Sequence, residues 1–164
     1  MTWTGSNHGQ NPAVGSWTDA VYLSTDDTWS LDDVLLKKVE HVGTLAIGQS
    51  YPGVTDAILP AVHDGNYRVI VRTDLFDEVF EGTIDEQNNV RAAPGALAVS
   101  VPPLRVNIAE NTTLGTDQSR LYRLEVGANQ TIRLTLTTPF SDAANEIYAR
   151  FGDAASPLAH DFSH

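Results

Sequence analysis

Four aspartates crowd one short stretch of the chain. They fall within eight consecutive residues and are Asp26, Asp27, Asp32 and Asp33. Calcium takes six to eight oxygen ligands, and a divalent cation turns the mutual repulsion of crowded carboxylates into coordination. If a metal binds this chain, the stretch predicts that it is calcium, with these four residues as its ligands. The alternative interpretation is a solvated loop, because the spacing lacks the ligand alternation and the turn glycine of an EF-hand.

A second acidic segment lies between residues 74 and 89. Its densest part holds Glu81, Asp85 and Glu86. The same argument from oxygen ligands applies to this segment, although it offers fewer carboxylates close together than the first. We interpret it as a solvated rim, with calcium as the weaker alternative.

Catalytic chemistry has little support in the sequence. The chain has no cysteine, which excludes thiol nucleophiles, disulfides and zinc–thiolate sites. It also lacks a G-x-S-x-G elbow and an H-E-x-x-H pair. His160 and His164 are four residues apart, but the tail has weak helical character, so we read the spacing as chance. Carboxylate pairs of the glycosidase kind stay open. We predict a protein that is not an enzyme and has no catalytic residues.

Two tryptophans raise the question of a sugar-stacking platform. Trp17 lies in an alternating apolar segment, and Trp29 lies in the acidic loop that follows. Aromatic rings on an exposed face can stack on glycans, whereas a tryptophan on an alternating strand more often packs in the core. We expect Trp17 to be a core residue and Trp29 to fold over the loop as a plug.

Charge and hydropathy exclude two classes of partner. The formal net charge is -11 and the ten basic residues are scattered, whereas nucleic-acid binding needs clustered lysine and arginine. No run of about 18 apolar residues occurs, so we expect no membrane insertion. The first ten residues show no signal-peptide pattern. Residues 1–4 resemble the tail of a strand, so we interpret the chain as a piece of a longer protein.

Alternating apolar residues predict an all-β fold. The acidic loop sits between two such segments in residues 16–36. In the first of these, Trp17, Asp19, Val21 and Leu23 share one face, and Thr18, Ala20, Tyr22 and Ser24 share the other. Residues 67–73 form the clearest further strand, residues 50–59 and 97–101 predict two more, and residues 5–16 predict a loop. No segment shows sustained helical periodicity, so we expect under about 10% helix.

The pair Pro102 and Pro103 marks the best boundary in the chain. Beyond it, residues 121–126 and 131–137 alternate and are separated by four residues containing glycine, which predicts a hairpin. Residues 147–151 predict a third strand, and we expect no further strong strand in residues 152–164. With about 60 residues, this second unit is near the lower limit for independent folding.

The first unit, residues 1–101, resembles CARDB, the cell-adhesion-related domain found in bacteria, which is an immunoglobulin-like β-sandwich. The likeness rests on four segments: residues 17–24 (WTDAVYLS) with Asp26, residues 33–36 (DVLL), the strand that starts at 65–67 (GNY), and the acidic turn 85–90 (DEQNNV). The opening strand of the family would precede Met1.

The second unit, residues 102–164, is similar to the bacterial pre-peptidase C-terminal domain, a small β-sandwich. The likeness rests on residues 117–126 (DQSRLYRLEV), 127–136 (GANQTIRLTL) and 142–152 (DAANEIYARFG). The chain ends before the last strands of that family, so we expect an incomplete second sandwich.

Both resemblances imply a role outside the cell. They favour a non-catalytic structural or adhesion module of a large bacterial surface or secreted protein, with neighbouring domains of the same chain as its partners. One alternative is a binding module for a carbohydrate or for a surface protein. Another is an accessory domain of a secreted peptidase.

Overall fold

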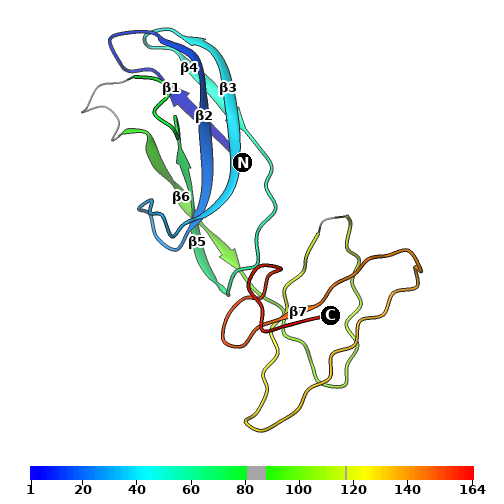
Figure 1. Ribbon diagram of the computed structural model, residues 1–164. Coiled ribbons are helices and arrows are strands. Elements are labelled where there is room, and N and C mark those ends of the chain that lie inside the picture. The colour runs from blue at the N-terminus through cyan, green and yellow to red at the C-terminus, as the bar shows by residue number, and fades with distance from the viewer. Residues whose placement is uncertain (81–87, 117) are drawn as a thin grey trace. The chain divides into compact units, whose positions relative to one another are not determined.

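The computed structural model describes residues 1–80, 88–116 and 118–164 (Figure 1). Within these residues the chain forms strands and no α-helix, so the predicted all-β fold class is confirmed. No helix in this part of the chain is long and apolar enough to cross a membrane. The chain divides into two compact units, Met1–Pro60 with Gly65–Ala98, and Ala61–Asp64 with Val99–His164.

Unit 1 contains two antiparallel sheets. Its strands are β1 (Thr2–Ser6), β2 (Ala13–Ser24), β3 (Val34–Leu45), β4 (Ser50–Val54), β5 (Gly65–Arg72) and β6 (Val90–Val99). The larger sheet has the order β3-β2-β5-β6, and the smaller sheet pairs β1 with β4. Figure 1 shows the small sheet lying against one face of the large one, which is a sandwich of four strands on two.

Strand β2 is the centre of the large sheet. It pairs with β3 in a register that places Trp17 opposite His41, and with β5 in a register that places Tyr22 opposite Ile70. Its residues 19–24 are all buried, so both faces of the strand are covered. The alternation predicted from the sequence is correct, but neither face is the solvent-facing side that alternation usually indicates.

Each face of β2 contributes to its own apolar cluster. On the inner face, toward the small sheet, Trp17 packs with Leu45 and Tyr51. On the outer face, Ala20 and Tyr22 pack with Ile70 and with partly buried residues that include Trp29. The predictions that Trp17 is a core residue and that Trp29 folds over as a plug are therefore confirmed, since Trp17 is only 4% exposed.

Several strand boundaries differ from the sequence prediction. The loop predicted over residues 5–16 is shorter, because β1 runs to Ser6 and β2 begins at Ala13. Strand β4 ends at Val54, where residues 50–59 had been predicted as strand. Strand β6 starts at Val90 instead of residue 97. In each case pairing with a neighbouring strand, which the local pattern does not encode, sets the ends.

Unit 2 has little regular structure. Its strands are the short pair β7 (Tyr148–Ala149) and β8 (Phe162–Ser163). The predicted strands at 121–126 and 131–137 are wrong, and the tail contains the two-residue strand β8. An alternating segment becomes a stable strand only with a paired neighbour and a covered apolar face. In residues 131–137 the alternate apolar side chains stay 40% or more exposed, namely Ile132, Leu134 and Leu136.

Asp64 ties the segment Ala61–Asp64 into unit 2. Its carboxylate accepts a hydrogen bond from the backbone N–H of Val101 at 2.5 Å and pairs with the Arg123 guanidinium at 2.6 Å. Arg123 in turn bridges to Pro103, with its backbone N–H donating to the Pro102 carbonyl at 3.0 Å. The chain divides after Ala98, and the domain assignment with a boundary at 101/102 stays a prediction.

Replacing Gly53 by alanine tests how closely the small sheet is packed. A Cβ at Gly53 would lie 1.9 Å from the ring of Trp3, which lies opposite this glycine on the paired strand β1. The ring must move, so Gly53→Ala should destabilise unit 1 by about 1–3 kcal/mol in urea unfolding. Gly95→Ala is the control, because a Cβ there meets nothing within 4 Å. Equal midpoints for the two variants would contradict this packing.

Limited digestion with trypsin tests whether unit 2 is less regularly structured than unit 1. The basic residues of unit 1, at positions 37, 38, 68, 72 and 91, all lie in strands, whereas those of unit 2, at 105, 120, 123, 133 and 150, lie outside them. Cleavage requires local opening of the backbone, which strand pairing resists. Trypsin should therefore cut unit 2 first and leave a fragment ending at Arg105, seen by mass spectrometry. Early cleavage at Arg68 or Arg72 would contradict this order.

Candidate functional site

The four aspartates of the predicted calcium site lie on the loop between β2 and β3. Asp26, Asp27 and Asp32 are exposed, and Asp33 is partly exposed. Among the described residues, no group of three or more histidine, aspartate or glutamate side chains comes together in a way that could hold a metal. Calcium at this loop stays a prediction.

Two of these carboxylates have local partners. Asp26 Oδ1 accepts a hydrogen bond from the Thr28 N–H at 2.8 Å, and Asp33 Oδ2 accepts one from the Ser30 N–H at 2.8 Å. Such bonds are typical turn contacts of aspartate and stabilise the loop without a cation. Each leaves the second oxygen of its carboxylate available, so the loop retains acceptors for solvent or an ion.

The second acidic segment falls partly outside the described residues. Glu81, Asp85 and Glu86 are among the residues 81–87 that the structure does not describe. The start of the segment is described and turns sharply at Asp74 and Asp77, whose φ angles are 47° and 55°. This turn brings one of its carboxylates against β2, where a second buried carboxylate lies.

That second carboxylate, Asp19, is the most deeply buried charged side chain of the described residues at 1% exposure. Its Oδ2 accepts hydrogen bonds from Trp3 Nε1 at 2.9 Å and from the Tyr51 hydroxyl at 2.7 Å. Its Oδ1 accepts a longer bond, 3.3 Å, from the Asp74 backbone N–H. Asp19 on β2 is thus bonded to β1, to β4 and to the turn after β5.

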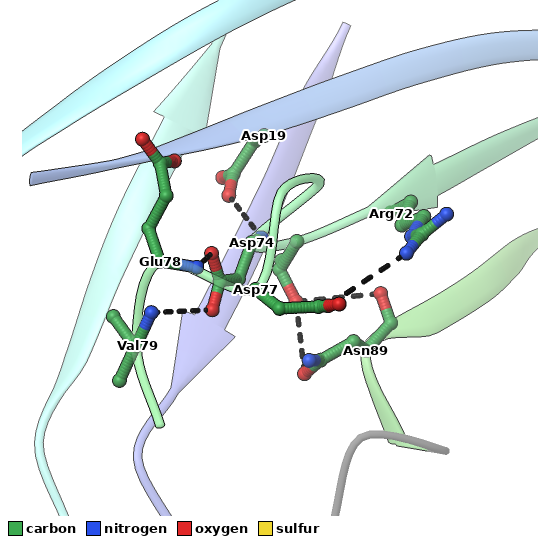
Figure 2. A network of polar contacts seen from close by, with 8 residues as sticks. Asp19, Arg72, Asp74, Asp77, Glu78, Val79 and Asn89 are labelled. Atoms are coloured by element: carbon green, nitrogen blue, oxygen red, sulfur yellow. Dashed lines mark hydrogen bonds and ion pairs between the residues drawn. The ribbon is translucent and has the colours of Figure 1, made fainter. Parts of the chain in front are cut away.

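Asp74 organises the turn that follows β5 (Figure 2). Its Oδ1 accepts from the Glu78 N–H at 2.7 Å, and its Oδ2 accepts from the Val79 N–H at 2.8 Å. The turn is bound to β2 through the Thr18 backbone, whose N–H donates to Glu78 Oε2 at 2.7 Å and whose carbonyl accepts from the Leu75 N–H at 2.6 Å. The Asp74 bonds fix the shape of the turn, and the Thr18 bonds hold the turn against β2.

The far side of the turn is joined to β6 and to the outer face. Thr73 donates its backbone N–H to the Asn89 carbonyl at 2.8 Å, and Arg72 lies 3.9 Å from Asp77. The Arg72 guanidinium also lies over the Trp29 ring at 4.6 Å, a cation–π contact. Figure 2 shows Arg72 and Asn89 on the opposite side of the turn from Glu78 and Val79.

Aromatic rings surround the Asp19 carboxylate on the inner face. Trp17 donates its Nε1–H to the Tyr51 hydroxyl at 3.1 Å, and the two rings meet edge to face. His41 stacks on both of them, with ring centroids 4.1 Å from Trp17 and 4.2 Å from Tyr51. The carboxylate, two indoles, a phenol and an imidazole form one polar cluster, which we call the Asp19 cluster; its Trp3 and His41 members are only partly buried.

Burial governs the protonation of this region. It raises the pKa of Tyr51 far above its ordinary value, and the hydrogen bond that Tyr51 donates to Asp19 adds to the rise. Burial also raises the pKa of Asp74 above its ordinary 3.8, against the opposing effect of the Val79 and Glu78 amides. The Tyr51 hydroxyl is therefore a neutral donor, and its proton serves the Asp19 carboxylate.

The Asp19 cluster can bind its own sheets together, but its geometry does not present a reacting group. Both Asp19 oxygens are engaged by internal donors, and Trp17, Tyr51 and Asp19 are each less than 10% exposed. A general base must reach a proton on a substrate, which requires access to it. The chemistry of this site is therefore hydrogen bonding between the two sheets.

A separate polar pair lies in unit 2. His63 Nε2 and Asp153 Oδ1 are 2.7 Å apart, and Arg150 approaches the same carboxylate at 2.7 Å. The Ala154 N–H lowers the pKa of Asp153, and the hydrogen bond with His63 lowers it further. Of the two tail histidines, His160 stacks on Tyr148 and pairs with the Ser156 carbonyl, whereas the His164 backbone pairs with Ile147.

No family model, curated protein or solved structure matches the chain. The resemblances to CARDB and to the pre-peptidase C-terminal domain therefore remain sequence interpretations. The buried role of Asp19 is the feature that sequence reasoning missed. Its one signal was an aspartate on the same face as Trp17, Val21 and Leu23.

Removing the Asp19 carboxylate should lower the free energy of unfolding of unit 1. Asp19→Ala leaves the Trp3 indole N–H and the Tyr51 hydroxyl without their acceptor inside the sandwich. Each unsatisfied buried donor costs about 1–3 kcal/mol, so unit 1 should lose at least about 2 kcal/mol in urea unfolding. Asp56→Ala, at an exposed side chain, is the control and should change stability by less than about 0.5 kcal/mol. Similar losses in both variants would contradict the role of Asp19.

Asp74 predicts a distinct dependence of stability on pH. A carboxyl whose pKa is raised in the folded state stabilises the fold fully below the unfolded pKa, and this contribution is lost as pH rises through the folded pKa. The stability of the wild type relative to Asp74→Asn should therefore fall as pH rises from 3.8 toward neutral. Urea unfolding of both proteins at several pH values measures this difference. A difference that grows over this range would show that the amides of Glu78 and Val79 outweigh burial.

A calcium titration separates the two interpretations of the loop at 26–33. Binding to the folded state alone raises the free energy of unfolding by about 2.7 kcal/mol at a hundredfold excess over Kd. If the aspartates bind calcium, millimolar calcium raises Tm, chelator reverses the rise, and Asp26→Asn with Asp33→Asn abolishes it. Asparagine is preferred to alanine because it keeps an acceptor oxygen for the Thr28 and Ser30 amides. A melt unchanged by calcium identifies a solvated loop.

Proposed function

We propose that this chain is a non-catalytic structural or adhesion module of a large bacterial surface or secreted protein. Its work would be to space or display neighbouring domains of the same chain. The extracellular location rests on the sequence resemblance to CARDB and to the pre-peptidase C-terminal domain.

The observation that carries the proposal is the use of the buried polar groups. The Asp19 carboxylate receives its donors from β1, β4 and the turn after β5, so its hydrogen bonds join the two sheets of unit 1. The Asp74 carboxylate caps two amides of its own turn. Catalytic groups must be accessible to substrate, whereas here the Asp19 bonds resist separation of the sheets and the Asp74 bonds fix the turn. This is what a module under mechanical load requires.

Force spectroscopy tests the mechanical role. A tandem array of unit 1 pulled by its ends should give repeated unfolding peaks, and the peak force should fall in Asp19→Asn, which weakens the bonds between the sheets. Asp56→Asn, at an exposed position, should leave the force unchanged. Extension without a resolvable peak would contradict a mechanical function.

Of the two tryptophans considered for carbohydrate binding, Trp17 is buried. Trp17 is 4% exposed and hydrogen-bonded to Tyr51, so it has no face to offer a sugar. Trp29 is partly buried, and the Arg72 guanidinium already lies over its ring. A glycan array probed with the whole chain would favour this alternative over the mechanical one if Trp29→Ala removed a specific signal.

A further inference from the structure

The small sheet of unit 1 covers only part of the inner face of the large sheet. A groove of about 600 Å³ lies beside β1 and is lined by residues of β1, β5 and β6, among them Trp3, Val69, Val71, Arg91 and Ala93. Val69 and Val71 pair with Leu23 and Val21 of β2, so they share the inner face, yet both are only half-buried. Apolar side chains on the core side of the sheet thus line an open groove.

Within the described residues, the backbone of β1 has one unpaired edge, and this edge lies along the groove. Met1 and Thr55 exchange both backbone hydrogen bonds, at 2.8 and 3.1 Å, and Asn7 donates to the Gln49 carbonyl at 2.9 Å. In an antiparallel ladder alternate residues point to the same partner, so Thr2, Thr4 and Ser6 direct their N–H and C=O groups to the opposite edge. Within the described residues no strand pairs with that edge.

A second copy of the chain does not fit this edge. Trp3 of β1 is bonded to Asp19 of the central strand β2, and β4 lies toward β3, so β5 and β6 extend beyond β1 in the facing layer. Antiparallel pairing of two β1 edges, about a two-fold axis perpendicular to the small sheet, would place each β5–β6 pair in the space of the other. A single extended segment has no second layer and avoids this collision.

The charge of the groove indicates the chemistry of such a segment. Ala92 packs in the outer cluster, so its neighbours Arg91 and Ala93 face the groove. The Arg91 guanidinium has no ion pair or hydrogen bond with the described residues. Asp74, which also lines the groove, is occupied by the Glu78 and Val79 amides. A carboxylate on the incoming segment would pair with Arg91.

We propose that the groove docks an extended strand of a partner protein by β-strand addition. The strand would pair its backbone with Thr2, Thr4 and Ser6 and add a third strand to the small sheet. Its inward side chains would be small and apolar over Val69 and Val71, with one carboxylate opposite Arg91. Main-chain bonds supply affinity in this mode of recognition, and the alternate side chains supply specificity.

This inference goes beyond the proposed function, because a module that only spaces other domains needs no docked strand. The two can therefore fail separately. Loss of peptide binding with intact unfolding forces would remove the docking site alone, and loss of mechanical resistance with intact peptide binding would remove the mechanical role alone.

Synthetic peptides supply the probe. An eight-residue peptide that alternates valine with threonine and carries glutamate in place of one valine is titrated into the whole chain and followed by calorimetry. A series that moves the glutamate among the valine positions locates the pairing register. The same peptide with lysine for glutamate tests charge, and one N-methylated along one edge tests backbone pairing. We expect the glutamate peptide to bind at least about tenfold more tightly than either control.

Two variants assign the contacts. Arg91→Glu should reverse the preference, so that the lysine peptide binds more tightly than the glutamate peptide. Arg105→Glu is the matched control, with the same change of net charge at a residue of unit 2. Thr4→Pro removes one donor from the unused edge and spares the pairing with β4, because its N–H points away from that strand. It should weaken binding about tenfold with the Tm of unit 1 retained.

Hydrogen exchange gives the decisive readout. Bound glutamate peptide should slow exchange at the amides of Thr4 and Ser6 and leave those of Trp3 and Gly5, already paired with β4, unchanged. No binding by any peptide of the series, or equal binding of the glutamate and lysine peptides, would overturn the proposal. A dimer in sedimentation with protected Thr4 and Ser6 amides before any peptide is added would also overturn it, in favour of a second copy.

Discussion

The arrangement of unit 1 depends on one buried carboxylate. Asp19 sits on the central strand at 1% exposure and needs hydrogen-bond donors, because an unpaired charge inside a sandwich is strongly destabilising. The donors come from Trp3, Tyr51 and the Asp74 backbone. Satisfying this one group therefore fixes the small sheet over β2 and holds the turn after β5 against the core.

The glycines of the small sheet follow from the same constraint. Trp3 and Tyr51 must turn their rings inward to reach Asp19, and each ring lies over the glycine directly across from it, Gly53 and Gly5 respectively. A Cβ at Gly5 would lie 2.2 Å from the Tyr51 ring, so a side chain there would push the donor away. The two aromatic donors and the two glycines, on the paired strands β1 and β4, thus pack together and depend on one another.

Local patterns predicted what depends on neighbours in sequence. The alternation of β2, the burial of Trp17 and the loop position of Asp26 and Asp33 could all be read from the chain. The role of Asp19 could not, because its donors stand 16, 32 and 55 residues away. The alternation at 131–137 gave a wrong prediction because the pattern suits a strand, but no strand forms there without a pairing partner. Counting charges in the loop at 26–33 likewise omitted the Thr28 and Ser30 amides that engage two of them.

The hydrogen bonds to Asp19 also explain why the small sheet lies to one side of the large sheet. Two strands cannot cover a four-stranded sheet, and an apolar interface alone would favour sliding the small sheet to the middle, over β2 and β5. Hydrogen bonds to Asp19 are directional, so they keep β1 and β4 over β2 and β3. The inner side chains of β5 and β6 are then left beside an edge of β1 with which no described strand pairs. The open groove is therefore a consequence of the same interaction that gives the unit its stability.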